Sequence, residues 1–175
     1  MMASVADRCR TIATFRRVSV RLMETLARWT PTTPEMEAKV TFGRHIWQLA
    51  QHADRLGKRT FELRQKEHYS LEPAPAYAAL LDQVAAETAT AARLAGFYDG
   101  LLPGLLARCQ SYLESTDPIL DGPSVVIMEG IIRDLDGMRA EAAALQSELR
   151  LPPGADSLAI RERGIPSFLQ ESAAS

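Results

Sequence analysis

The sequence predicts an all-α protein built as a four-helix bundle. Long segments repeat apolar residues every three or four positions, which is the period of an amphipathic helix, and no segment alternates apolar and polar residues as a strand would. Clusters of proline, glycine and aspartate separate these segments, as turns do. With 175 residues, 46% of them hydrophobic, the chain is large enough for one domain with a substantial core. We expect the bundle to cover residues 1–150 and an irregular C-terminal tail to cover 151–175.

The first two expected helices cover about 5–29 and 34–66. Pro31 and Pro34 lie between them and prevent the first helix from continuing. Thr33 is expected to cap the second helix, with Pro34 in its first turn. The apolar seam of the first helix consists of Ile12, Phe15, Leu22, Leu26 and Trp29.

The third expected helix begins near residue 76, is rich in alanine and continues to Tyr98. Gly100, Pro103 and Gly104 interrupt its pattern, which then resumes as far as Tyr112, so we expect a kinked third helix or two abutting helices. Turn-forming residues follow, and the fourth helix is expected over about 124–149. Its seam consists of Met128, Ile131, Leu135, Met138, Ala142 and Leu145.

Composition excludes several classes of protein. The formal net charge is −2, and no helical face gathers enough lysine and arginine to neutralise a row of phosphates, so a nucleic-acid partner is not expected. Cys9 and Cys109 are too few for a disulfide framework or a cysteine zinc site. No run reaches the roughly 18 apolar residues that span a bilayer, and no secretory signal is apparent. We expect a cytoplasmic protein without membrane contact.

The second helix contains the strongest candidates for functional residues. His45, Leu49, His52 and Leu56 lie on one stripe at helical spacing, so two of the three histidines are expected to face the core. A second apolar stripe on the same helix is expected to contact another neighbour. It consists of Val40, Gly43, Trp47 and Ala50.

A metal centre of the di-iron type needs more ligands than the sequence offers. Such bundles supply Glu-x-x-His from two helices, because side chains three residues apart share a face. The positions three before His45 and His52 hold Phe42 and Leu49, and the two histidines lie about 10.5 Å apart along the axis. On the fourth helix, the positions three after the acids Glu129 and Asp136 hold Ile132 and Arg139. We therefore expect no bound metal.

Two interpretations of the histidines remain open. In the first, each is a core residue whose ring is hydrogen-bonded to a carboxylate, a tyrosine hydroxyl or a backbone carbonyl. In the second, the histidines share one buried pocket with acids, where a carboxylate beside an imidazole could perform general acid–base catalysis without metal. The expected catalytic residues of this pocket are His45, His52, Glu129 and Asp136, and the expected substrate-binding residues are Glu87 and Tyr98.

Two stretches resemble a known family. Residues 43–47 (GRHIW) with 50–56 (AQHADRL) are similar to the second helix of bacterial ferritin-like proteins, and 114–118 (ESTDP) with 122–125 (GPSV) resemble the turn into their last helix. The resemblance covers residues 5 to 150 and implies a ferritin-like four-helix bundle. Relatives often bind two metal ions and perform oxidative chemistry. Of their ligands, only His52 has a match here, because the carboxylate pattern departs from that of the family.

These observations lead to two functional expectations. The first is a metal-free ferritin-like protein that acts as a binding or catalytic subunit in small-molecule biosynthesis, such as a natural-product pathway, within a homo- or hetero-oligomer. The alternative is a metal-dependent ferritin-like oxidase or oxygenase that uses iron or manganese. We prefer the first because the sequence supplies fewer metal ligands than a di-iron centre needs.

Overall fold

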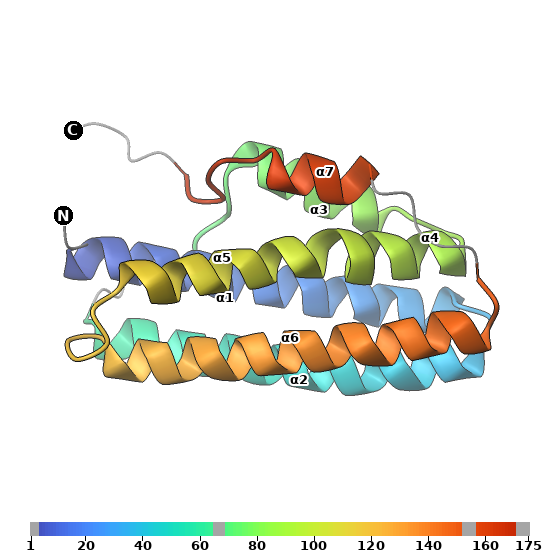
Figure 1. The fold of residues 1–175 in the computed structure, drawn as a ribbon, viewed down its shortest axis with the longest axis horizontal. Helices are drawn as coiled ribbons and strands as arrows, with labels where there is room; N and C mark the ends of the chain where they lie inside the picture. Colours follow the sequence, from blue (N-terminus) through green and yellow to red (C-terminus); the bar gives the residue numbers. More distant parts are fainter. Residues whose placement is uncertain (1–3, 65–68, 152–156, 171–175) are drawn as a thin grey trace.

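The computed structural model describes residues 4–64, 69–151 and 157–170. Within these ranges the chain is helical and contains no strand, which confirms the predicted all-α class. The long helices lie side by side in a bundle, with two short helices, α3 and α7, on the side of α5 away from α2 and α6 (Figure 1). The long helices are α1 (Val5–Trp29), α2 (Met36–Glu62), α5 (Leu102–Ser115) and α6 (Gly122–Glu148), and the short ones are α3 (Pro75–Ala85) and α7 (Ser157–Arg163).

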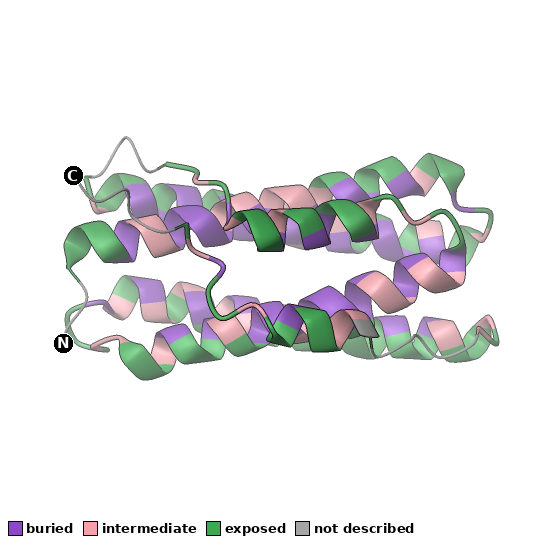
Figure 2. Ribbon diagram, turned by 90° about the horizontal axis from the view of Figure 1, so that it is seen from above, coloured by how far each residue is buried: buried purple, intermediate pink, exposed green. Residues whose placement is uncertain are grey.

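Helix α1 begins and ends where the sequence predicts. Ser4 and Asp7 form a reciprocal cap, in which the Asp7 N–H donates to Ser4 Oγ and the Ser4 N–H donates to the Asp7 carboxylate. The predicted seam residues of α1 and α6 are all buried. Buried residues, purple in Figure 2, occur along the whole length of the long helices, so the core runs the length of the bundle.

The start of α2 differs from the prediction. The short 3₁₀ turn η1 (Thr30–Thr32) follows α1, and α2 begins at Met36 rather than at Pro34. Thr33 does not cap α2, because its hydroxyl donates to the Trp29 carbonyl (2.9 Å). Helix α2 ends at Glu62, and Arg64 follows with a positive φ of 56°. The predicted end at residue 66 lies outside the described residues.

The prediction of a continuous helix from residue 76 was wrong. Helix α3 ends at Ala85, and the chain resumes at α4 (Thr90–Leu94). Buried Arg93 stabilises this break, since its guanidinium donates to the Glu87 carbonyl (2.9 Å) and to the hydroxyls of Thr32 (2.9 Å) and Thr33 (2.8 Å). Thr32 and Thr33 come from the turn after α1, so the break depends on tertiary contacts that the periodicity of one helix cannot predict.

The irregularity predicted near Gly100 and Pro103 takes the form of a π-helical stretch. This segment, η3 (Ala95–Leu101), joins α4 to α5, and Pro103 lies in the first turn of α5. Proline is tolerated in the first turn of an α-helix, and π-helical stretches occur mostly as short bulges within helices. The stretch places Tyr98 in the core.

The described part of the C-terminal segment is packed rather than irregular. Helix α7 lies against η3 and α5, and a Cβ added to Gly104 would overlap the buried carboxylate of Glu162. Farther along, the Phe168 ring packs on Phe15 with a centroid distance of 4.7 Å and belongs to the same hydrophobic core as the bundle. The predicted irregular tail therefore contributes a helix and an aromatic core residue.

A buried ion pair joins three of the helices. Asp121 is fully buried and accepts hydrogen bonds from Arg59 (3.0 Å), Tyr112 (2.5 Å) and Thr116 (2.9 Å), while Arg59 also donates to Ser124 (2.8 Å). Burial by itself would raise the pKa of Asp121, but the hydrogen bonds outweigh it and leave this pKa lowered. The sequence predicts only a turn at this position.

Candidate functional site

The two histidines of α2 lie in the core, as the stripe of the sequence predicts. His45 is 0% exposed and His52 is 1% exposed. Buried Leu49 lies between them along α2. A buried imidazole needs hydrogen-bond partners to offset its lost hydration, so the groups that face each ring determine what it can do.

Each histidine pairs with one carboxylate of α6. His45 Nε2 lies 3.3 Å from Glu141 Oε2, and His52 Nε2 lies 2.8 Å from Asp134 Oδ2. Since α2 and α6 are antiparallel, the i, i+7 spacing of the histidines matches the i, i+7 spacing of the acids. The result is two similar His–carboxylate pairs, one above the other, rather than one shared pocket.

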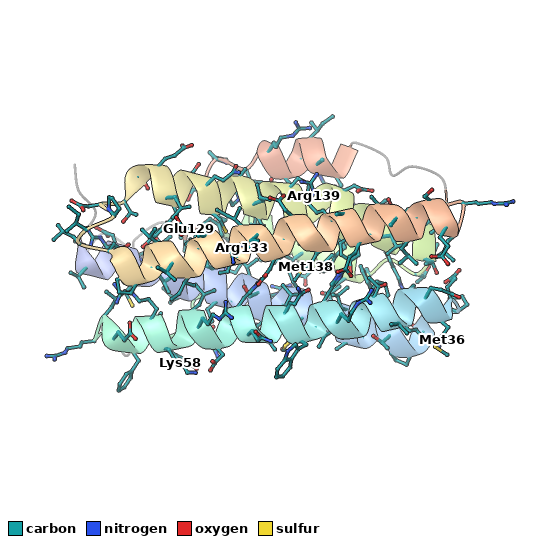
Figure 3. All side chains as sticks on the ribbon, turned by 60° about the horizontal axis from the view of Figure 1, so that its bottom comes forward. Met36, Lys58, Glu129, Arg133, Met138 and Arg139 are labelled. Atoms are coloured by element: carbon teal, nitrogen blue, oxygen red, sulfur yellow. The ribbon has the colours of Figure 1, made fainter. Side chains whose placement is uncertain are left out.

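Glu129 and Asp136, the acids expected at the site, are exposed on α6 and contact neither histidine, so their predicted placement was wrong. Glu129 is on the outside of the helix (Figure 3). At about 100° per residue, both lie about 130–150° from the centre of the α6 seam, whereas Asp134 and Glu141 lie about 70–90° from it. The acids at the edge of the seam could therefore have been identified from the sequence by measuring this angle.

Of the two predicted substrate-binding residues, Tyr98 lies beside His45 and Glu87 does not. The Tyr98 hydroxyl is 2.7 Å from His45 Nδ1, and the two rings meet edge to face. Glu87 lies in the connection after α3, where its backbone carbonyl accepts a hydrogen bond from Arg93. Tyr98 is only 1% exposed, so it contacts His45 rather than a ligand at the surface.

The partners of His45 determine its tautomer. An ionised carboxylate can only accept hydrogen bonds, so Nε2 carries the proton and donates to Glu141. Nδ1 is then the acceptor for the Tyr98 O–H. Burial lowers the pKa of His45, and the charge of Glu141 opposes this effect without reversing it. Burial also raises the pKa of Tyr98 well above its usual value, so the hydroxyl stays protonated.

His52 is arranged in the same way but lacks a second partner. Burial lowers its pKa, while the hydrogen bond to Asp134 and the charge of that carboxylate act in the opposite direction. Its Nδ1 is buried without a hydrogen-bond partner among the described residues. His45 is therefore the histidine whose ring is fixed at both nitrogens.

A groove between α2 and α6 reaches Glu141 from the surface. It has a volume of about 420 Å³, and Glu141 is 45% exposed at its wall. Arg44 pairs with the same carboxylate at 3.1 Å. His45 does not line the groove. The site is thus a surface carboxylate held from behind by a buried imidazole and from the side by a guanidinium. The groove is lined by Met36, Glu37, Val40, Thr41, Arg44, Glu141, Ala144, Leu145 and Glu148.

Comparisons with protein families, with curated proteins and with solved structures give no match to this chain. The ferritin-like resemblance therefore stays a prediction. In the described ranges, no helix is both long and apolar enough to cross a membrane.

The described residues do not fit a metal centre of the predicted alternative type. Nowhere among them do three or more histidine, cysteine, aspartate or glutamate side chains converge as a metal site requires. Each His–carboxylate pair supplies two donors, and the space between the pairs is occupied along α2 by buried Leu49. Iron or manganese bound in a bundle core usually has carboxylates from several helices around it.

Proposed function

We propose that this chain is a metal-free helical-bundle protein that binds a small molecule in the groove between α2 and α6 and transfers a proton through Glu141. The observation that carries the proposal is the position of this carboxylate. It is exposed to the groove, while the buried His45 and the neighbouring Arg44 both hold it in place. Such support is typical of a side chain that must keep one geometry during a reaction.

The lining of the groove favours a ligand that bears an amine. Glu37, Glu141 and Glu148 contribute three carboxylates, against the single guanidinium of Arg44. Met36 and Val40 provide apolar surface for the rest of the molecule. A cationic amine with a short apolar body would complement both the charge and the chemistry of this lining.

Glu141 is the group that exchanges the proton in this scheme. The ammonium N–H bond of the ligand breaks, the proton passes to a Glu141 oxygen, and the amine keeps the electron pair as a nucleophile. His45 continues to donate from Nε2 and remains neutral. Tyr98, by donating to Nδ1, holds the ring in the tautomer that can donate to the carboxylate. His45 and Tyr98 are positioning residues, because neither reaches the groove.

The proposal extends to a role in small-molecule biosynthesis, within a homo- or hetero-oligomer. An amine deprotonated at a carboxylate is a nucleophile for bond formation, and ring closure or acyl transfer would consume it. A subunit that only binds the amine for another chain would need the same groove. The metal-dependent oxidase would need at least one further donor beside a His–carboxylate pair.

The test measures the binding of a panel of small primary amines by ligand-observed NMR. We expect Glu141→Gln to weaken binding at least tenfold, while Glu129→Gln, which removes an exposed carboxylate from the same helix outside the groove, leaves it unchanged. Equal binding to wild type and Glu141→Gln would overturn the proposal. So would about two equivalents of iron or manganese per chain in elemental analysis, the stoichiometry of a dinuclear bundle.

A further inference from the structure

Arg8 is a buried arginine without a counterion among the described residues. It lies in the first turns of α1 with only 9% of its surface exposed, and none of the described carboxylates lies within ion-pair distance of it. Its Nε is buried and has no hydrogen-bond partner among the described residues. A buried N–H without a partner is costly and is normally satisfied by an acceptor. The missing partner is therefore expected to be a bound anion.

Arg8 lines a cavity that has the shape and chemistry for such an anion. The cavity is about 230 Å³ in volume and lies between α1, the end of α5 and the packed C-terminal segment. Since water takes about 30 Å³ in the liquid, this is roughly the space of seven or eight waters. The aromatic part of the wall consists of Phe15, Tyr112 and Phe168, and the hydroxyl part of Thr11, Ser111, Ser115 and Thr116.

The other charged groups in the wall already have partners. Arg108 pairs with buried Glu162 at 2.9 Å and donates to the Ile165 carbonyl. Asp117 accepts hydrogen bonds from the N–H groups that follow it, at 2.8 and 3.1 Å. Arg8 is therefore the charge that remains to be neutralised.

We propose that this cavity binds a small organic acid, with its carboxylate on Arg8 and its apolar body against the aromatic rings. Phe15 and Phe168 supply the apolar contact, and Ser111 supplies a hydroxyl at the rim. The groove at Glu141 is separate, because it is formed by α2 and α6. The cavity fits an aromatic or short alkyl carboxylic acid of about ten non-hydrogen atoms.

Thermal unfolding of the full chain with benzoate, hexanoate, benzamide and inorganic phosphate tests the assignment. Benzamide has the ring of benzoate without its charge, and phosphate has the charge without the ring. We expect one of the two carboxylates to raise Tm by roughly 5–10 °C at a hundredfold excess over its Kd, and the other two compounds to have no effect. Equal protection by benzamide or by phosphate, or no protection by either carboxylate, would overturn the proposal.

Two variants locate the effect. Arg8→Gln should abolish the protection, while Arg28→Gln, which removes an exposed guanidinium from the other end of α1, should keep it. Without ligand, Arg8→Gln should unfold at the same temperature as wild type or higher, because it removes a buried N–H that has no partner among the described residues. Protection that survives in Arg8→Gln, or a large loss of Tm in that variant without ligand, would show that Arg8 has a structural partner instead.

A different observation concerns the outer face of α2. The stripe that the sequence predicts to contact a neighbouring helix faces solvent, with Val40 54% and Trp47 67% exposed. Exposed Met36 and Phe61 extend the stripe to both ends of the helix. The spacing alternates between four and three residues, which is the repeat that pairs one helix with another. Residues 36, 40, 43, 47, 50, 54 and 61 make up this stripe. Gly57 continues the spacing but is buried, since a Cβ built on it would meet Arg16 and Tyr69.

We infer that a second copy of the chain packs on this stripe in antiparallel orientation. Met36 and Val40 also line the groove at Glu141, so in the dimer the partner chain forms part of the wall of that groove. In the register centred between Trp47 and Ala50, the indole of each copy meets the small Ala50 of the other, and Met36 meets Phe61. Gly43 leaves room beside the indole, since no atom lies within 4 Å of a Cβ built on it. Asp54 interrupts the stripe and is paired with Lys58 of its own chain at 2.7 Å.

Charge favours the antiparallel orientation over the parallel one. Glu37 and Lys58 are three seven-residue repeats apart, so they lie on the same flank of the stripe. They are near opposite ends of α2, where Figure 3 labels Met36, the neighbour of Glu37, and Lys58. Antiparallel pairing brings Glu37 of each copy to Lys58 of the other. Parallel pairing would bring Glu37 to Glu37, which is repulsive.

Sedimentation velocity combined with a charge swap tests this interface. We expect a dimer for wild type and for Glu129→Lys, a control on α6. We expect a shift toward monomer for Glu37→Lys and recovery of the dimer in Glu37→Lys with Lys58→Glu. A monomeric wild type, or a double variant no more dimeric than the single one, would contradict the pairing.

Discussion

Replacing Tyr98 with phenylalanine removes one hydroxyl group from the buried end of the site. The ring can stay in place, so the change creates no large cavity, but His45 Nδ1 loses its only donor at 2.7 Å. Leaving a buried acceptor without a partner costs about 1–3 kcal/mol. For a chain of this size, that cost lowers Tm by roughly 2–12 °C. We therefore expect Tyr98→Phe to be measurably less stable while keeping its helical circular dichroism spectrum.

Urea unfolding followed by circular dichroism measures this cost. Tyr69→Phe is the matched control, because it removes the same hydroxyl from a residue that is 50% exposed, and it should change the free energy of unfolding by less than about 0.5 kcal/mol. A Tyr98→Phe protein as stable as wild type would refute the reasoning, because it would mean that His45 Nδ1 does not depend on the tyrosine.

Further predictions concern stability and reactivity. Asp121→Ala should destabilise the fold by about 3–5 kcal/mol in urea unfolding, since it removes the buried carboxylate that pairs with Arg59 and accepts from Tyr112 and Thr116, and leaves Arg59 only the exposed carboxylate of Glu62. The pKa of His52 is lowered in the fold, so the unfolded chain binds more protons below about pH 6.5. Stability should be full above that pH and fall as the pH drops below it, and His52→Asn should flatten this dependence. Gly104→Ala should lower Tm because its methyl group would overlap a buried carboxylate of α7, whereas Gly137→Ala, with open space around it, should leave Tm unchanged or raise it. Burial raises the pKa of Cys109 to about 12, so its thiol should resist Ellman's reagent at pH 8 until urea is added.

The sequence predicts the parts of the fold that repeat along one helix. The bounds of α1, the seam of α6 and the burial of both α2 histidines follow from periodicity, and the structure confirms them. The break after Ala85 does not follow, because the alanine-rich pattern continues through it. It depends on Arg93, which finds its partners in the turn after α1.

At the candidate site, too, the sequence predicts some of the contacts and not others. His45 and Tyr98 lie together as the pocket hypothesis requires, but the acids that face the histidines are Asp134 and Glu141. Their angular position on α6 and their seven-residue spacing are visible in the sequence. Which of several acids on α6 turns toward α2 depends on how the two helices pack.

The packing of the C-terminal segment could not be read from the sequence either. The segment after residue 151 has scattered apolar residues without a period, yet Phe168 contacts the aromatic rings of Phe15 and Tyr77. Contacts of this kind join residues far apart in the chain, and only the closed bundle provides the surface that receives them. The cavity beside Arg8 exists because this segment packs there.

The central claim is that buried His45 donates to Glu141 from Nε2 and so fixes the carboxylate that faces the groove. Long-range ¹⁵N–¹H NMR of the histidine rings across a pH titration, in wild type and in Glu141→Gln, tests it most directly. We expect the neutral Nε2–H tautomer at pH 7, a pKa for His45 below 6.5, and a further fall of this pKa in Glu141→Gln, since the carboxylate acts to raise it. An Nδ1–H tautomer, or a His45 pKa that does not change in Glu141→Gln, would contradict the claim.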